Sequence, residues 1–129
     1  MVRPEIQLIS NIVVQDNQGR VLFVKYDPEI ERWWLPGEDL TPYQHPDERA
    51  REILDGLTGL EWDDLSLVFV ESFRGRRGWH VMFNYRAVGR GEPSGSIPAS
   101  WFPSEAIPQT MHGKWEHSVV QRILASSGV

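Results

Sequence analysis

Two apolar-rich segments open the chain, at residues 6–15 and 20–26, and a short polar stretch separates them. That stretch is Asp16-Asn17-Gln18-Gly19, in which Asn and Gly tolerate the positive φ angles of a tight turn. The pattern therefore predicts a β-hairpin. A polar loop at 27–32 and a strand-like run at 33–35 follow, and Pro36-Gly37 is then predicted to interrupt regular structure.

A helix is predicted over residues 46–58, because Pro46 suits the first helical position and Gly59 suits a left-handed cap. At about 100° per residue, one arc of roughly 100° is apolar. This arc holds Ala50, Ile53, Leu54 and Leu57. The opposite side is acidic and holds Glu48, Glu52 and Asp55. We expect the apolar arc to pack against the protein and the acidic side to face water.

A second hairpin is predicted around the turn at 74–78, with arms at 66–73 and 79–87. The second arm alternates with a period of two, the clearest strand signal in the chain. There Trp79, Val81, Phe83, Tyr85 and Ala87 interleave with His80, Met82, Asn84 and Arg86. Residues 89–96 are predicted as a surface loop, 97–102 as a strand and 114–125 as a final helix. The elements predict one α+β domain spanning residues 1–129.

Composition narrows the range of partners. Apolar residues make up 40% and charged residues 24% of the chain, an ordinary globular mixture. A net charge of -5 argues against a nucleic-acid polymer or an anionic membrane as the main partner, and favours a small-molecule ligand. The absence of cysteine excludes disulfides and thiolate metal sites. The first ten residues lack the apolar core of a signal peptide, so we expect a cytoplasmic protein.

Two motifs carry a resemblance to a known family. Residues 33–37 read W-x-L-P-G, and Thr58-Gly59-Leu60 follows the predicted helix. With the flanking hairpins and closing helix, this order resembles the Nudix (MutT-like) family over nearly the whole chain. The resemblance implies the Nudix fold, an α/β/α sandwich around a mixed β-sheet. It also permits a homodimer, because Nudix proteins often pair.

The family's box reads G-x5-E-x7-R-E-U-x-E-E-x-G-U, where U is apolar, and its helical glutamates hold Mg²⁺ or Mn²⁺ on a diphosphate. An alignment without gaps, anchored on Leu35-Pro36-Gly37 and Thr58-Gly59-Leu60, places other residues at these positions. The first Gly of the box becomes Glu38 and the first Glu becomes Gln44. The metal-binding positions become Ile53, Gly56 and Leu57. In this register the box is degenerate, and no metal or other cofactor is expected.

A shifted register is an alternative. One deletion and one insertion would return Arg51, Glu52 and Asp55 to the box, and Glu48 would complete an acidic triplet that binds Mg²⁺ or Mn²⁺. The same three acidic residues would then be catalytic, together with Glu116 from a late loop. Against this alternative, the apolar arc of the helix lies opposite them, so packing would direct them into solvent.

Several other residues are candidates for ligand binding. Trp33 and Trp34 suit stacking on a planar group, although at least one is expected in the core because adjacent strand residues face opposite ways. Tyr43 would donate a hydrogen bond to a ligand near Gly37. Arg74, at the tip of the second hairpin, would clamp a phosphate, unless the tip is merely solvated.

Two further groups come from the second half of the chain. On one face of the strand at 79–87, His80 is a candidate acid or base and Asn84 and Arg86 are candidate ligand contacts, unless that face is simply exposed. Near the last helix, Trp115 is a candidate ligand contact. The neighbouring His112 and His117 match no strong metal-binding spacing.

Three functions remain open at this stage. The first is a Nudix-fold protein without ordinary Mg²⁺-dependent diphosphate hydrolysis, which binds a nucleotide-like or other small ligand or performs metal-free acid–base chemistry in the groove. The second is an active hydrolase of nucleoside diphosphate derivatives that uses the shifted carboxylates. The third is an interaction module whose groove is closed by packing, with Ile53 and Leu57 fully buried and no cavity beside Gly37.

Overall fold

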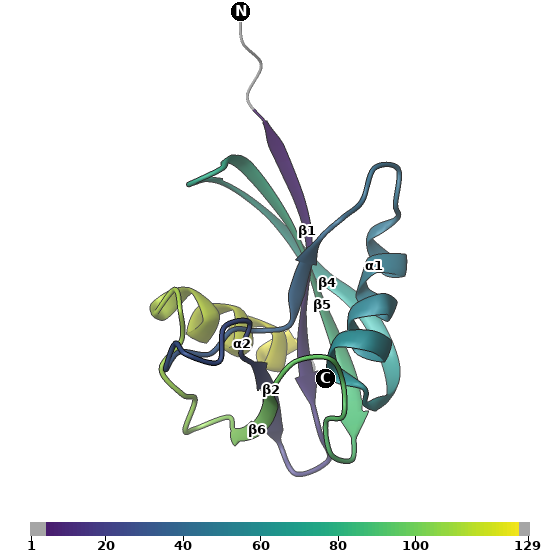
Figure 1. The fold of residues 1–129 in the computed structure, drawn as a ribbon, viewed down its shortest axis with the longest axis vertical. Helices are drawn as coiled ribbons and strands as arrows, with labels where there is room; N and C mark the ends of the chain where they lie inside the picture. The colour runs from purple at the N-terminus through teal and green to yellow at the C-terminus, as the bar shows by residue number, and fades with distance from the viewer. Residues whose placement is uncertain (1–4, 127–129) are drawn as a thin grey trace, which may run out of the picture.

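The computed structural model describes residues 5–126. The helices and strands of these residues follow one another in an α+β order (Figure 1). The elements are β1 (Ile6–Gln15), β2 (Arg20–Val24), β3 (Gly37–Asp39), α1 (Pro46–Glu52), η1 (Ile53–Thr58), β4 (Glu61–Gly75), β5 (Gly78–Arg90), β6 (Ala99–Pro103) and α2 (Lys114–Ser126). No helix within 5–126 is both long enough and apolar enough to cross a membrane.

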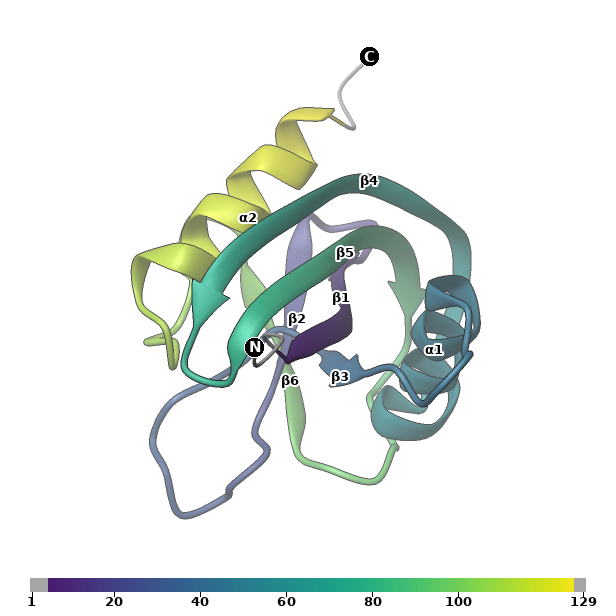
Figure 2. The same ribbon diagram turned by 90° about the horizontal axis from the view of Figure 1, so that it is seen from above.

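The strands form one mixed sheet with the order β4-β5-β1-β2-β6, and β3 pairs with one end of β1. Strand β1 runs parallel to β5 and antiparallel to β2 and β3. Figure 2 shows α1 and α2 on opposite sides of this sheet. The predicted fold class, an α/β/α sandwich around a mixed sheet, is confirmed.

Alternation along β1 and β2 divides the core into two clusters, one on each face of the sheet. On the face covered by α1 and η1, Ile12, Val14 and Leu22 pack with the buried residues of the helix. On the α2 face, Val13, Val21 and Phe23 pack against the apolar side of α2. Successive strand residues point to opposite faces, so a short apolar run such as 12–14 serves both layers.

The helix over residues 46–58 differs from its prediction in one respect. His45 caps its start, since its Nδ1 accepts a hydrogen bond from the Asp47 amide, and Gly59 ends it with φ of 67°. The second half, η1, is a π-helix, in which each turn contains an extra residue. Its sequence contains no proline or other obvious signal, so a regular periodicity of 100° per residue was the wrong description there.

Two boundaries also differ from the sequence-based expectations. Pro36 lies in a bend, as predicted, but Gly37 already begins β3 and pairs with Asn11 of β1. Strand β5 continues through Gly89 and Arg90, which were predicted as loop. A Cβ atom at Gly89 would lie only 2.7 Å from the Val14 side chain, so the glycine here permits close packing.

Candidate functional site

A shallow pocket of about 210 Å³ lies where β3 faces α1 and η1. Its lining consists of Glu38, Arg49, Glu52, Ile53 and Leu57. Ile53 is buried, whereas Leu57 is only partly buried and lines the pocket beside it. We call this the β3–α1 pocket. The interaction-module interpretation requires a groove closed by packing, with Leu57 fully buried and no cavity beside Gly37. The structure differs on both points, because the pocket lies next to Gly37 and Leu57 is partly exposed.

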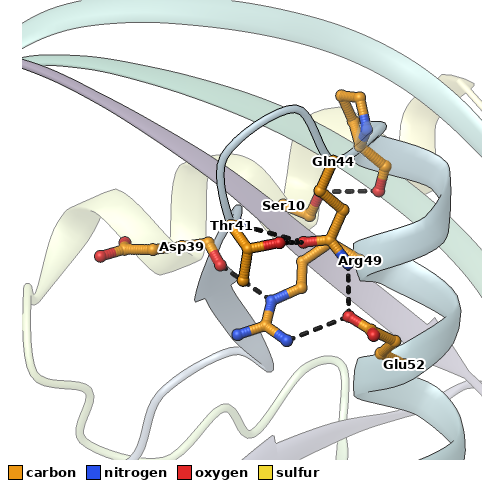
Figure 3. A network of polar contacts seen from close by, with 7 residues as sticks. Ser10, Asp39, Thr41, Gln44, Arg49 and Glu52 are labelled. Atoms are coloured by element: carbon orange, nitrogen blue, oxygen red, sulfur yellow. Dashed lines mark hydrogen bonds and ion pairs between the residues drawn. The ribbon is translucent and has the colours of Figure 1, made fainter.

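Polar contacts hold the rim of this pocket in place (Figure 3). Arg49 donates from Nε to the Asp39 carbonyl at 2.8 Å and from Nη1 to Glu52 at 3.1 Å. Gln44 donates to the same Glu52 oxygen, and its own carbonyl accepts from the Thr41 amide at 3.0 Å. The hydrogen bonds from Gln44 and Arg49 lower the pKa of Glu52, because they stabilise its ionised form. These contacts connect the loop before the helix to the helix itself.

Two residues of this pocket were not selected from the sequence, namely Arg49 and Glu38. Glu38 occupies the position of the first glycine of the box and was considered only as a lost glycine. Within the described residues, its carboxylate forms no hydrogen bond or ion pair, and it lies partly buried on β3. Burial raises the pKa of Glu38, while the nearby Arg49 partly offsets this shift. The sequence does contain a signal for Glu38, because an acidic residue directly follows the L-P-G motif.

Replacing Glu38 with glutamine is expected to stabilise the fold at pH 7. A raised pKa in the folded state means that ionised Glu38 opposes folding, so removing the charge helps at neutral pH. The difference between the two proteins should disappear as the pH falls below the ordinary glutamate pKa, where both carry a neutral group. Urea unfolding at pH 7 and at pH 4 measures this. Glu48→Gln, at an exposed position on α1, is the control for the substitution itself.

The three carboxylates of the shifted register do not fit a divalent metal. Glu48, Glu52 and Asp55 are all exposed, and Glu52 is held by Gln44 and Arg49. Asp55 accepts a hydrogen bond from Trp62 Nε1 at 2.7 Å. Within residues 5–126, no group of three or more His, Cys, Asp or Glu side chains is arranged to hold a metal ion.

A second group of candidate residues meets on the α2 face of the sheet. Buried Asn84 accepts from Asn11 Nδ2 at 3.0 Å and donates to Glu71 at 3.3 Å. Trp115 Nε1 donates to the same Glu71 oxygen at 3.1 Å. This series of side-chain hydrogen bonds links β1, β5, β4 and α2. Asn84 is fully buried, so the face of β5 that carries it is not the exposed sheet face considered above.

A buried carboxylate lies next to this series of hydrogen bonds. Glu116 is fully buried, and its Oε2 lies 2.9 Å from His112 Nδ1. The His112 ring lies edge-on to Trp34 and Trp115, with ring centroids 5.0 and 5.7 Å away. We call Trp34, His112, Trp115 and Glu116 the tryptophan cluster. The structure thus brings three of the predicted site residues together at the start of α2, along with His112.

The other candidates near the W-x-L-P-G motif line neither site, although Gly37 lies next to the β3–α1 pocket. Trp33 packs in the core against Phe102, with its ring 4.9 Å from Lys25 Nζ. Trp34 is therefore the tryptophan of this pair that lies with other candidate residues. Gly37 exchanges two hydrogen bonds with the Tyr26 hydroxyl. Tyr43 has a φ of 66° and a fully exposed side chain, and it is not among the residues that line the β3–α1 pocket.

The remaining candidates lie along the second hairpin, except His117, which lies in α2. His80 stacks on Phe73 at 5.3 Å and lies four residues from Asn84 along β5, about 13 Å away. Arg74 is exposed beside Trp79 in a second shallow hollow at the hairpin tip. Arg86 is partly buried, and its side chain forms no hydrogen bond or ion pair within the described residues. His117 is exposed. Among the described residues, none of these four side chains forms a hydrogen bond, ion pair or ring contact with a residue of the β3–α1 pocket or of the tryptophan cluster.

No protein-family model and no curated protein sequence matches this chain. Solved structures match its fold. A UDP-X diphosphatase superposes with a TM-score of 0.79 at 11% identity, over 98% of this chain and 65% of the other, so this chain spans less than two-thirds of that protein. The NUDIX domain of Shewanella oneidensis NrtR, solved with ADP ribose, gives 0.71 at 18% identity, covering 93% and 89%. A MutT protein from Bacillus halodurans gives 0.66 at 21% identity, covering 87% and 80%.

These similarities confirm the predicted Nudix fold. The identities are too low to carry an activity from those proteins to this one. What this chain does must therefore be argued from its own residues.

Proposed function

We propose, starting from the Nudix fold, that this chain binds a small organic ligand and does not perform ordinary metal-dependent diphosphate hydrolysis. The proposal includes the register without gaps, in which Ile53, Gly56 and Leu57 stand at the family's metal-binding positions. It keeps the expectation of no metal cofactor, a small-molecule partner and a cytoplasmic location. A homodimer remains compatible with it.

One observation carries the proposal: Ile53 and Leu57 line the pocket between the helix and β3. A hard cation such as Mg²⁺ requires oxygen ligands and gains nothing from aliphatic side chains. The positive charge in this pocket belongs to Arg49, which is already paired with Glu52. Glu38 and Glu52 both carry negative charge there, which disfavours a diphosphate in the absence of a metal.

Metal-free acid–base chemistry is a second candidate, and Glu38 favours it. A carboxylate with a raised pKa in a pocket holds its proton closer to neutral pH and exchanges it more readily with a substrate. The apolar side chains of Ile53 and Leu57 would face the non-reacting part of such a substrate. Loss of turnover in Glu38→Gln, with retained ligand binding, would distinguish this candidate from simple binding.

Removal of divalent metal is expected to change nothing. The wild-type protein should form no nucleoside monophosphate above background from nucleoside diphosphate derivatives, including ADP-ribose and UDP-sugars, with Mg²⁺ or Mn²⁺ or with EDTA. A verified Nudix hydrolase serves as the positive control for the assay. Turnover that EDTA abolishes, on any of these substrates, would sink the proposal.

Glu48→Ala and Asp55→Ala, at two of the carboxylates of the shifted register, are each expected to leave the protein folded and any activity intact. Both residues are exposed, and substitutions at such positions shift Tm by no more than about 3 °C. Calorimetry and ligand titration measure the two effects. If either variant lost activity while keeping its Tm, the shifted-register hydrolase would become the better interpretation.

A further inference from the structure

One end of the sheet extends beyond the helices. Figure 1 shows the start of β1 and the turn between β4 and β5 at this end, past α1 and α2. On β1, Ser10 Oγ donates to the Pro46 carbonyl at the start of α1. Leu8 and Ile6 lie two and four residues before Ser10, so they point to the same face of the sheet. Both are exposed, because α1 begins only beside Ser10.

The neighbouring strands extend this apolar surface. Trp79 of β5 pairs with Ile6, and Val70 of β4 pairs with Phe83. Since Phe83 packs into the core on the α1 face, Val70 lies on that face as well. We call Ile6, Leu8, Val70 and Trp79 the apolar end patch, and each is between 41% and 52% exposed. Contiguous exposed apolar side chains of this size indicate an interaction surface.

Trp79 is positioned to anchor a partner. Its Nε1 donates to Ser72 Oγ, so its polar group is satisfied within the protein while much of the ring stays exposed. Trp79 and its cross-strand partner Arg74 line a hollow of about 410 Å³. Within the described residues, the side chains of Arg74 and Arg76 form no hydrogen bond or ion pair, whereas Arg77 is already paired with an aspartate of β3. The patch therefore suits an apolar side chain that is surrounded by carboxylates.

The chain itself contains such a segment. The loop between β2 and β3 carries Asp27-Pro28-Glu29-Ile30-Glu31, which we call the acidic loop, and all five residues are exposed. Lys25 Nζ lies 3.6 Å from Glu31, and the other two carboxylates have no cation beside them among the described residues. Figures 1 and 2 both show this loop and the turn between β4 and β5 on the left side of the molecule.

We propose that a second copy of this chain binds to the apolar end patch through its acidic loop. Ile30 of the loop packs against Trp79, and the loop carboxylates lie beside Arg74 and Arg76. Because each copy presents both surfaces on one side, the two contacts form together about a twofold axis. Opposite charges on the two surfaces fix the orientation of the pair. The inference goes beyond the proposed function and does not depend on it.

Sedimentation velocity over a range of protein concentrations tests whether the pair exists. The wild type should form a dimer with a Kd in the micromolar range, and added salt should weaken it. Trp79→Ala should weaken the dimer at least about tenfold, because it removes the anchor of both contacts. Tyr43→Ala is the matched control, since it removes an exposed aromatic side chain outside the patch, and it should dimerise like the wild type.

An exchange of charges tests which surfaces meet. The first variant carries Arg74→Glu and Arg76→Glu, and the second carries Glu29→Arg and Glu31→Arg. Each variant alone should be monomeric, because both of its contacts then join like charges. An equimolar mixture of the two should dimerise, because both contacts of the mixed pair join opposite charges. Arg51→Glu, at an exposed position on α1, is the control for charge reversal and should dimerise like the wild type.

The inference is overturned if the wild type stays monomeric at every concentration, which would leave the patch to a different protein. It is also overturned if Trp79→Ala dimerises as tightly as Tyr43→Ala, or if the mixture of the two charge variants stays monomeric. Should Trp79→Ala fail to fold, the exchange of charges decides alone. Metal-dependent turnover would reject the proposed function, whereas a monomeric wild type would reject only this interface.

Discussion

Replacing Leu54 with alanine is expected to lower the free energy of unfolding by about 2–5 kcal/mol. Leu54 is fully buried in η1 and belongs to the core between the helix and the sheet, with Ile12 and Tyr85. The truncation removes apolar surface from the core and leaves a cavity that the rigid sheet cannot close. Urea unfolding monitored by tryptophan fluorescence measures the loss, and Tm should fall by roughly 10 °C or more.

Leu57→Ala is the matched comparison, three residues further along the same helix. Leu57 is only partly buried and lines the β3–α1 pocket, so its truncation should cost roughly half as much or less. Equal losses at the two positions would mean that Leu57 is a core residue. The pocket would then be closed in solution, and the interaction-module interpretation would return.

The second large effect is expected at Gly95, where alanine should destabilise the fold by about 1–3 kcal/mol or more. A Cβ atom there would lie 2.0 Å from the Leu57 carbonyl oxygen and 2.4 Å from its carbonyl carbon. Both are backbone atoms of η1, so neither moves aside at low cost. The same loop donates from the Ser94 and Gly95 amides to the Thr58 carbonyl and from the Ser96 amide to the Gly56 carbonyl. A shift of the loop would therefore break the cap of the π-helix.

Gly56→Ala provides a control with the opposite sign. Gly56 is exposed, and a Cβ atom there would have no neighbour within 4 Å. Alanine is favoured over glycine inside a helix, so this variant should be more stable than the wild type by about 0.5–1 kcal/mol. Thermal unfolding of both variants decides the point. A Gly95→Ala protein as stable as the wild type would show that the loop is not held against η1.

Local sequence patterns predicted most of the fold. The Asn-Gly turn, the period of two in 79–87 and the apolar spacing in 46–58 each depend on neighbouring residues, and each element was found near its predicted position. The π-helix was missed because its cause is tertiary: the loop at 94–96 holds its last carbonyls. The start of β3 at Gly37 was missed for the same reason, since Gly37 pairs with Asn11 far earlier in the chain.

The candidate site was harder to predict, because it depends on which side chains meet across the fold. Trp34, Trp115 and Glu116 were each selected by residue type alone, and only the structure groups them. His112 was considered for metal binding, whereas it contacts a buried carboxylate. Glu38 was not selected because the family motif has glycine at that position. The residue was therefore interpreted as the loss of a glycine and not as the gain of a charged group in the pocket.

The parallel pairing of β1 with β5 has a consequence for how the chain acquires its structure. Asn11 and Asn84 are hydrogen-bonded partners that lie 73 residues apart in sequence. During synthesis, β1 can therefore pair with β5 only after most of the polypeptide has left the ribosome. Contacts of such long range slow the search for the native state.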